Sequence, residues 1–453
     1  MIVPLGAADA GTCGGKAGAL GALLRAGLPV PGGFVIPFAA YRAAVHGLGR
    51  AGGVPESLRR AIEERPVPAA LADALGHALA ELGDPPVAVR SSAAGEDTGQ
   101  ASAAGQHDSF LAVRGAAAVA GAVRACWASL FTARAVDYRG GGDAPAPGEP
   151  AMAVLVQRHV DAEVSGVMFT PDHADGVTRV EASWGLGPSV VGGTVTPDAY
   201  LVAGDGSVTR AVADKRTRLD RRGGRLVRSA VPGRDRGRPA VGDDSARLLA
   251  ELGDRIAAVR GGPQDVEWAI AGGRIWILQA RPITAAPPPL THPTPTGNPA
   301  ATGGPAPAGQ AAPAGQAAPA GQAAPAGQAA PAGQAAPAGQ AAPAPGTASV
   351  LVGTPGSHGV ATGTARIVRG PRDFPGARPG DIIVCPFTDP AWTPLLRVAA
   401  GVVTETGGVL SHAAIVAREH GIPAVLGVPD ATSLLRDGTT ITLDGTTGTV
   451  TAA

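Results

Sequence analysis

The sequence predicts a mixed fold class, α/β and α+β, with two ordered domains joined by a low-complexity linker. Residues 1–285 contain helix-like and strand-like runs in turn, whereas residues 349–453 contain short strand-like runs and one helix. Between them, residues 286–348 are dominated by a proline-containing repeat. A chain of 453 residues has room for two or three domains of ordinary size, which agrees with this division.

Composition argues against several classes of partner. The 37 basic and 37 acidic residues balance, so nothing favours nucleic acid or an anionic membrane surface. No apolar run reaches the length of about eighteen residues that a membrane span needs. The start, MIVPLGAADAG, lacks the basic and apolar regions of a signal peptide. Cys13, Cys126 and Cys385 are odd in number and far apart, which fits a reducing compartment. We therefore expect a cytoplasmic protein that binds neither nucleic acid nor a membrane.

The first block opens with a motif suited to phosphate. Gly14 and Gly15 precede Lys16 at the start of a helix-like run, so the backbone can approach a phosphate while Lys16 supplies charge. The motif is not a P-loop, and a glycine turn with a surface lysine is the alternative. Lys16 and Lys215 are the two lysines among the 37 basic residues, which a coding bias toward arginine explains. A lysine that persists despite this bias is expected where a compact charge is needed, and this expectation applies more to Lys16 than to Lys215.

A second motif follows a short apolar strand. The run VAV, residues 87–89, delivers Arg90 into a loop rich in serine, glycine and alanine. A guanidinium in such a place can bind a phosphate through two parallel hydrogen bonds. Glycines that could line a nucleotide follow at positions 185, 187, 192 and 193.

The first block ends in a predicted β-hairpin. Residues Asp265 to Thr284 alternate apolar and polar side chains around a turn at Gly272-Gly273. On the two strands, Glu267, Gln279 and Arg281 can share one face. A carboxylate and an amide oxygen on adjacent strands are hard ligands suited to Mg²⁺. The alternative is a surface hairpin with scattered polar residues.

The linker, residues 286–348, contains the hexamer AAPAGQ, in which PAGQ occurs six times. Proline at every sixth position blocks a helix, and alanine is the largest aliphatic side chain in the repeat, so no core can form. We therefore expect a disordered spacer. Sixty-odd residues at roughly 5–6 Å × √n give about 45 Å between its ends, which suits a tether between two domains.

The last block is organised around the stretch TETGGVLSHAAIVAREHGIPAVLG, residues 404–427. Ser411 can cap a helix that begins at His412 and ends before Gly421. The backbone N–H groups at such a helix start favour an anion, and a neutral imidazole is a competent nucleophile toward phosphorus. A capped core histidine is the alternative reading.

The string GGxxSHAAIVAREHGIPAV resembles the phosphohistidine motif of the phosphoenolpyruvate-utilising enzymes, which include phosphoenolpyruvate synthase, pyruvate phosphate dikinase and rifampin phosphotransferase. The strings GGKAGALG, VRSSAAGED, SGVMFTPD, DVEWAI and ILQARPIT occur in the order of the ATP-grasp domain of the same enzymes. The resemblance implies an ATP-grasp domain at 1–285, the AAPAGQ linker at 286–348 and a swivelling β/β/α phosphohistidine domain at 349–453. It also implies a phosphorylated His412, ATP phosphates bound by Lys16, Arg90 and Arg281, and Mg²⁺ held by Glu267 and Gln279.

Some positions depart from the family pattern or have a secondary role. The usual ASFAGQ reads ASAAGQ at 101–106, ATAED reads AAGED at 93–97, and Pro188 replaces an acidic residue. We expect Thr404 and Glu405 to orient His412. Further expectations are that Arg418 packs structurally or meets a docking partner, and that Lys215 lies near the nucleotide.

By this resemblance, ATP phosphorylates His412 with release of AMP and phosphate. Phospho-His412 then passes the group to pyruvate, as in phosphoenolpyruvate synthase, or to an antibiotic or small alcohol. The relatives carry a third domain that binds the acceptor, and the sequence has no stretch for it, so we expect a separate acceptor-binding protein. The alternatives are an ATP-binding phosphocarrier or regulatory module without a small-molecule acceptor, and a binding protein that has lost activity.

Overall fold

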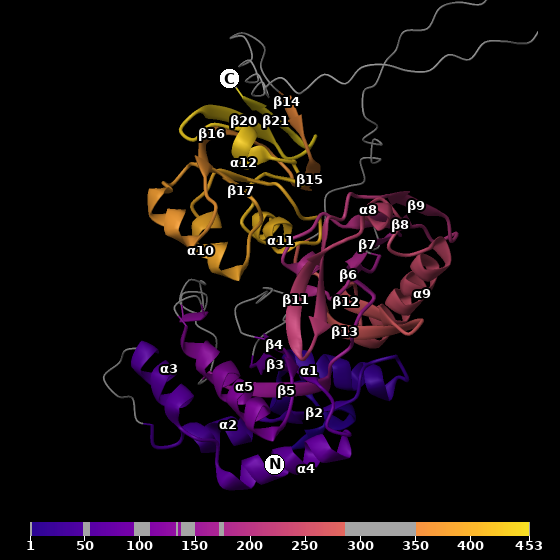
Figure 1. The fold of residues 1–453 in the computed structure, drawn as a ribbon, viewed down its shortest axis with the longest axis vertical. Helices are drawn as coiled ribbons and strands as arrows, with labels where there is room; N and C mark the ends of the chain where they lie inside the picture. Colours follow the sequence, from indigo (N-terminus) through magenta and orange to yellow (C-terminus); the bar gives the residue numbers. More distant parts are fainter. Residues whose placement is uncertain are drawn as a thin grey trace, which may run out of the picture. The chain divides into compact units, whose positions relative to one another are not determined.

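The computed structural model describes residues 2–48, 55–94, 109–132, 135–136, 150–171, 176–285 and 350–452. The predicted linker and the departures at 95–97 and 101–106 lie outside these ranges. Described residues of both predicted domains belong to one compact unit, and their elements are labelled in Figure 1. The mixed α/β and α+β fold class is confirmed for this part of the chain.

The first sheet of the N-terminal domain has five strands in the order β1-β2-β5-β3-β4, and all neighbours are antiparallel. Its central strand β5 is buried along nearly its whole length, which accounts for the continuous apolar run MAVLV. The strands are β1 (Val3–Pro4), β2 (Gly33–Ile36), β3 (Val87–Ala93), β4 (Ser109–Val113) and β5 (Met152–Arg158).

Helices pack beside this sheet around a core that contains Trp127 and Leu20. Asp9 caps the first helix by accepting a hydrogen bond from the Thr12 N–H at 3.0 Å. Within that helix Gly14 has φ 80°, and a Cβ there would overlap Ser92 of β3. The helical segments are η1 (Leu5–Ala7), α1 (Ala10–Arg25), α2 (Phe38–Val45), α3 (Pro55–Glu64), α4 (Ala69–Glu81), α5 (Ala116–Ala128) and η2 (Ser129–Phe131).

The second sheet has six strands in the order β13-β12-β6-β7-β8-β9, again antiparallel throughout. Helix α9 (Asp243–Arg260) packs against it and ends at Gly261, which adopts φ 79° as a left-handed cap. The strands are β6 (Val164–Phe169), β7 (Thr178–Trp184), β8 (Asp198–Val202), β9 (Val208–Ala211), β12 (Gln264–Ala271) and β13 (Arg274–Pro282). Two short helices, α7 (Pro188–Val191) and α8 (Gly233–Arg236), complete this half.

A separate two-stranded hairpin is inserted between these strands. It consists of β10 (Thr217–Arg222) and β11 (Arg225–Ala230), joined by a turn at Gly223-Gly224 where both φ angles are positive. Its strands carry few buried side chains, so its position depends on a small number of anchors.

The C-terminal domain contains one sheet of eight strands in the order β14-β21-β20-β16-β17-β18-β19-β15. The middle strands β16 to β19 run parallel, and antiparallel strands flank them. Alternate residues of β17 point to opposite cores, with Ile383 on the side of α11 and Ile382 on the side of α12. The strands are β14 (Val350–Val352), β15 (Thr354–Ser357), β16 (Val360–Ile367), β17 (Ile382–Cys385), β18 (Gly401–Thr404), β19 (Ala424–Leu426), β20 (Thr440–Asp444) and β21 (Thr449–Ala452). The helical segments are η3 (Pro371–Gly376), η4 (Pro390–Trp392), α10 (Thr393–Leu396), α11 (His412–Glu419) and α12 (Ala431–Leu434).

Lys215 is a fully buried structural cation. Its Nζ lies 2.6 Å from Asp198 Oδ1, and both side chains are 0% exposed. Asp198 also accepts hydrogen bonds from the Ala213 and Ala240 N–H groups, and Lys215 donates to the Ala213 carbonyl. The pair therefore holds the approach to β10 against β8. This placement differs from the expectation that Lys215 lies near the nucleotide.

We predict that Lys215→Met destabilises the domain by about 3–5 kcal/mol, because it leaves the Asp198 carboxylate buried without its cation. Chemical unfolding measures this change. As a control, Arg216→Ala removes the exposed ion pair with Asp214 and is expected to change stability by about 0–1 kcal/mol. The double variant Lys215→Met, Asp198→Asn should recover part of the loss. A Lys215→Met effect no larger than that of Arg216→Ala would contradict the structural role.

Candidate active site

The hairpin β12–β13 presents a carboxylate and an amide opposite each other. Glu267 and Gln279 are paired directly across the two strands, as the sequence predicted. The turn at Gly272-Gly273 has φ 57° and 71°, which glycine adopts without strain. Directly opposed side chains lie close enough to act together on one ligand. The pair thus offers two oxygen ligands at one place on the sheet.

Arg90 extends from β3 of the other sheet to this hairpin. Its Nη1 lies 3.5 Å from Glu267 Oε2 and donates to the Leu278 carbonyl at 3.3 Å. Its Nε is buried and has no hydrogen-bond partner among the described residues. Leaving a buried guanidinium N–H without an acceptor costs free energy, so the Nε–H of Arg90 is a donor for an acceptor atom on a ligand.

Lys16 lies on α1, two residues beyond the bend at Gly14, and is partly exposed. The adjacent Ala17 N–H donates to Ser92 Oγ at 3.2 Å, which ties this turn of α1 to β3. Helix α1 also contacts β13. The predicted phosphate-binding residues Lys16 and Arg90 are therefore carried by neighbouring elements, next to the hairpin with Glu267 and Gln279.

Arg281 forms a buried ion pair. Its Nη2 and Nε lie 2.7 and 2.9 Å from Asp265 Oδ2, and the two residues are paired across β12 and β13. The carboxylate fixes the direction of the guanidinium. The charge of Arg281 is also close enough to His412 to contribute to lowering the pKa of that imidazole. Arg281 thus links the hairpin to the histidine.

His412 begins helix α11, and its ring is fixed by two threonine hydroxyls. Nδ1 lies 2.9 Å from Thr388 Oγ1, whereas Nε2 is 3.4 Å from Thr393 Oγ1. The residue is 5% exposed. Burial, together with the charge of Arg281, lowers its pKa to about 4. The imidazole is consequently neutral near pH 7, and the shorter bond at Nδ1 leaves Nε2 as the nitrogen with the available lone pair.

The residues that orient His412 differ from those expected. Thr404 donates to the Thr406 carbonyl, and Glu405 accepts from the N–H and hydroxyl of Thr432. The structure assigns the orienting role to Thr388. The two residues meet because β17 and β18 are parallel neighbours and their carboxyl ends lie at one sheet edge. Thr388 follows β17 and His412 follows β18, but without the pairing of these strands the spacing in sequence shows nothing.

The loop before His412 is held by a buried carboxylate. Val409 and Leu410 N–H groups donate to Glu181 Oε1 and Oε2 at 2.6 and 3.2 Å. Burial raises the pKa of Glu181 to about 7, although the two backbone bonds and Arg418 act in the opposite direction. A Cβ at Gly408 would overlap the Glu181 carboxylate, so a larger residue there would have to displace this side chain from its bonds to Val409 and Leu410.

Further contacts attach the same loop to the N-terminal domain. Thr406 Oγ1 donates to the Gly193 carbonyl at 2.6 Å, so Gly193 supports the loop that precedes His412. Leu410 packs in an apolar cluster with Phe169 and Val190. Arg418 Nη1 donates to the carbonyls of Gly356 and Val409, which fits the expected structural role of this arginine. The loop that precedes His412 is therefore held by polar and apolar contacts together.

The implied Mg²⁺ fits the residues present. Glu267 and Gln279 supply a carboxylate and an amide oxygen, and a magnesium ion commonly takes its remaining ligands from water and substrate phosphates. In the described ranges no group of three or more His, Cys, Asp or Glu residues could hold a metal. A cation here would therefore depend on the substrate for most of its ligands. Across these ranges, no helix is both long and apolar enough to cross a membrane.

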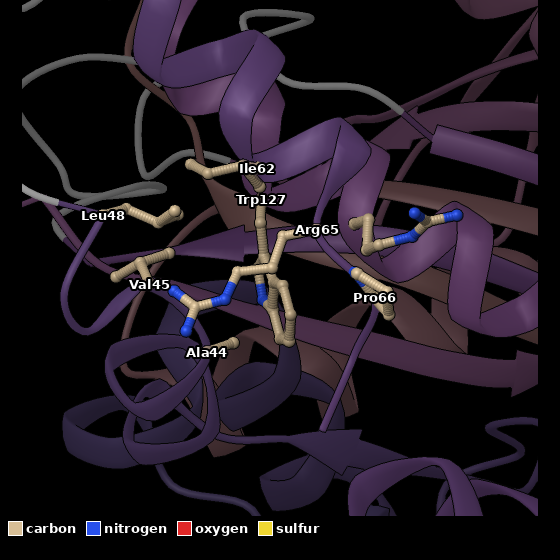
Figure 2. A pocket seen from close by; sticks show the side chains of 8 residues that line it. Ala44, Val45, Leu48, Ile62, Arg65, Pro66 and Trp127 are labelled. Atoms are coloured by element: carbon tan, nitrogen blue, oxygen red, sulfur yellow. The ribbon is translucent and has the colours of Figure 1, made fainter. Parts of the chain in front are cut away.

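A small pocket lies away from all of these residues (Figure 2). It encloses about 210 Å³, including space open to solvent, and contacts α2, α3 and α5. Its lining residues are Ala44, Val45, Leu48, Ile62, Arg65, Pro66, Arg124 and Trp127. None of the predicted site residues borders it, so it is not the candidate active site.

We predict that the His412 resonance does not titrate between pH 5.5 and 8. With a pKa of about 4 the imidazole is about 97% neutral at pH 5.5, whereas an ordinary histidine would be about 9% neutral. NMR of protein labelled at histidine Cε1, with His412→Asn for assignment, measures this. Arg281→Gln should move the pKa upward because it removes the neighbouring positive charge. A midpoint near 6.5 in the wild-type protein would contradict the buried, neutral state.

Two family models match the chain. The pyruvate phosphate dikinase AMP/ATP-binding domain matches residues 10–296, and the PEP-utilising enzyme mobile domain matches residues 377–448. A probable phosphoenolpyruvate synthase of Methanothermobacter thermautotrophicus is 36% identical over 98% of this chain and 62% of the relative. The phosphoenolpyruvate synthase of Aeropyrum pernix is 34% identical over 97% of this chain and 56% of its own length. The prodigiosin synthesizing transferase PigC of Serratia marcescens is 38% identical over 61% of this chain and 32% of its own length.

The chain thus spans between half and two thirds of the phosphoenolpyruvate synthases it matches. Among solved structures, an Enzyme I structure covers 17% of this chain at 30% identity with a TM-score of 0.16, which is too low to carry an argument. The match to residues 10–296 covers more than half of the chain. The chain therefore belongs to the phosphoenolpyruvate synthase and pyruvate phosphate dikinase family.

Proposed function

We propose that this chain catalyses the ATP-dependent phosphorylation of its own His412, with release of AMP and phosphate. The observation that carries the proposal is a buried, neutral imidazole at the start of α11, with Nδ1 bound to Thr388 and with Arg281 nearby. A neutral ring with one nitrogen occupied presents the other as a nucleophile. The match to an AMP/ATP-binding domain supplies the phosphoryl donor.

Each remaining site residue has a role in this proposal. Lys16, Arg90 and Arg281 bind the phosphates of ATP, and their charges oppose the negative charge that the phosphates bring together. Glu267 and Gln279 hold Mg²⁺. The ion, when bound, neutralises phosphate charge and helps to align the nucleotide.

The lone pair of His412 Nε2 forms a bond to the β-phosphorus, the bond between that phosphorus and the oxygen bridging to the α-phosphate breaks, and AMP leaves. A water molecule then takes the terminal phosphoryl group as inorganic phosphate, and phospho-His412 remains. We assign the tautomer in which Nδ1 is protonated and donates to Thr388 Oγ1, 2.9 Å away, so that positive charge developing on the imidazole is stabilised.

The second half-reaction requires an acceptor. The names of the relatives suggest pyruvate, which would give phosphoenolpyruvate, and a hydroxylated antibiotic or small alcohol is the other acceptor class that we propose. We place the acceptor on a separate polypeptide, which the phosphohistidine domain at 349–453 reaches on the linker at 286–348. The ATP-grasp domain at 1–285 would remain with the nucleotide, and the reaction would take place in the cytoplasm.

A single-turnover incubation with Mg·ATP tests the first half-reaction. AMP and phosphate release are followed together with an acid-labile phosphoryl group on the His412 peptide by mass spectrometry. We expect stoichiometric AMP and label in the wild-type protein and neither in His412→Ala. ADP without AMP would contradict the dikinase reaction. If pyruvate and small alcohols leave phospho-His412 intact, the protein is a phosphocarrier or regulatory module instead.

A second prediction concerns the loop that precedes His412. Gly408→Ala places a Cβ against the Glu181 carboxylate, so we expect His412 phosphorylation to fall at least about tenfold through loss of the seated loop while ATP binding is kept. Gly376→Ala is the control, because a Cβ at Gly376 meets no neighbouring atom and should leave the phosphorylation rate unchanged. Gly438→Ala is unsuitable as a control, because the positive φ of Gly438 would strain an alanine. Full activity of Gly408→Ala would show that this contact is not needed.

A further inference from the structure

The β10–β11 hairpin has two faces of different character. Because paired residues of an antiparallel ribbon share a face, Leu219 and Arg228 project to one side, which we call the inner face. Arg218 and Ser229, also directly paired, project to the other, which we call the outer face. Arg221 with Leu226 belongs to the inner face, and Arg222 with Arg225 to the outer face.

Charges on the outer face are largely compensated within the hairpin. Arg218 donates to both oxygens of Asp220 at 2.7–2.9 Å, and Arg222 Nη2 lies 3.6 Å from Asp220 Oδ2. The Ser229 hydroxyl is a further donor to Asp220 at 3.5 Å. The basic residues of this face therefore have a local structural explanation, except for Arg225 next to the turn.

The inner face is anchored to the N-terminal domain at two points. Leu219 packs with Val160 and Leu278, and its carbonyl accepts from the Leu186 N–H at 2.8 Å. A Cβ at Gly185 would overlap the Leu219 carbonyl, which shows how closely the hairpin approaches. Further along β10, Arg221 Nε donates to Asp161 Oδ1 at 2.7 Å.

These anchors place the inner face beside Arg90. Leu278, which packs against the same small apolar cluster as Leu219, is also the residue whose carbonyl accepts from Arg90. The pKa of His159, next to Asp161, is lowered first by desolvation of its side chain and then by the charges of both Arg221 and Arg90, so both arginines lie near it. Strand β11 contacts β4, and in β4 Ser109 is paired with Arg90 of β3. Figure 1 shows β11 extending toward β3 and β4.

Arg228 is the inner-face cation without an acidic partner. It is directly opposite Leu219, its side chain is exposed, and it makes no ion pair with any described residue. Arg221 on the same face is neutralised by Asp161. An uncompensated guanidinium on the face that adjoins Arg90 matches an anion that arrives from solution.

We propose that the β10–β11 hairpin is a strap over the nucleotide site and that Arg228 binds a phosphoryl oxygen of the bound nucleoside triphosphate. The hairpin connects the two sheets that carry the phosphate-binding residues, since β10 contacts β7 of one sheet and β11 contacts β4 of the other. Arg228 is then a binding residue supplied by an element that neither sheet contains. The proposal rests on the proposed nucleotide site.

The test compares Arg228→Ala with Arg225→Ala, which removes the unpaired arginine of the outer face and so keeps the same net charge. Calorimetry measures the Kd of the full chain for Mg·AMP-PNP and for adenosine. We expect Arg228→Ala to weaken AMP-PNP binding about tenfold, as the loss of a charge-assisted hydrogen bond implies, and to leave adenosine binding unchanged. Arg228→Lys should keep part of the affinity, and Arg225→Ala should bind like the wild-type protein.

Several outcomes would overturn the strap. If Arg228→Ala and Arg225→Ala lose the same affinity for AMP-PNP, the effect is one of general electrostatics. If Arg228→Ala loses the same affinity for AMP-PNP and for adenosine, a contact with phosphate is excluded. Unchanged affinity in Arg228→Ala would exclude any role. Unfolding midpoints check that the variants remain folded. Wild-type protein that binds AMP-PNP through Arg228 but never labels His412 would support the strap and contradict the proposed phosphorylation, so the two failures are distinguishable.

Discussion

The register of β12 against β13 is the constraint on which the site depends. It sets Glu267 opposite Gln279 and Asp265 opposite Arg281 within one ladder. The first pair presents oxygen ligands, and the second directs a guanidinium whose charge acts on His412. Because side chains alternate with a period of two, a slip of one residue in either strand would move the two side chains of that strand to the other face and break both pairs. The proposed cation ligands, the proposed phosphate-binding Arg281 and its influence on His412 are thus coupled through backbone pairing.

Burial has opposite consequences for the two titratable groups near the phosphohistidine loop. It lowers the pKa of His412 to about 4 and raises that of Glu181 to about 7, because in both cases it disfavours the charged form. For the histidine this yields the neutral imidazole that the proposed phosphoryl transfer requires. For the glutamate it opposes the ionised state that two N–H donors favour. Burial therefore keeps the His412 imidazole neutral and leaves the Glu181 carboxyl group only partly ionised near pH 7.

The sequence was sufficient for features that depend on local chemistry. The β12–β13 hairpin and its turn followed from alternation and two glycines, and the helix starting at His412 followed from its flanking Ser411 and Gly421. Contacts made by tertiary structure could not be predicted in this way. Thr388 reaches His412 only because β17 and β18 are parallel neighbours. Lys215, expected near the nucleotide, pairs instead with Asp198, a partner that nothing in the local sequence indicates.

The two glycines before His412 illustrate how one motif can have two physical causes. In sequence, both glycines are consistent with the backbone freedom that a tight turn needs. Gly407 fits that explanation, since its φ of 113° is one that other residues rarely adopt. Gly408 has no positive φ, and glycine is needed there because the Glu181 carboxylate occupies the space of a Cβ. Gly407 is therefore explained by the backbone conformation of the loop, and Gly408 by the close approach of Glu181.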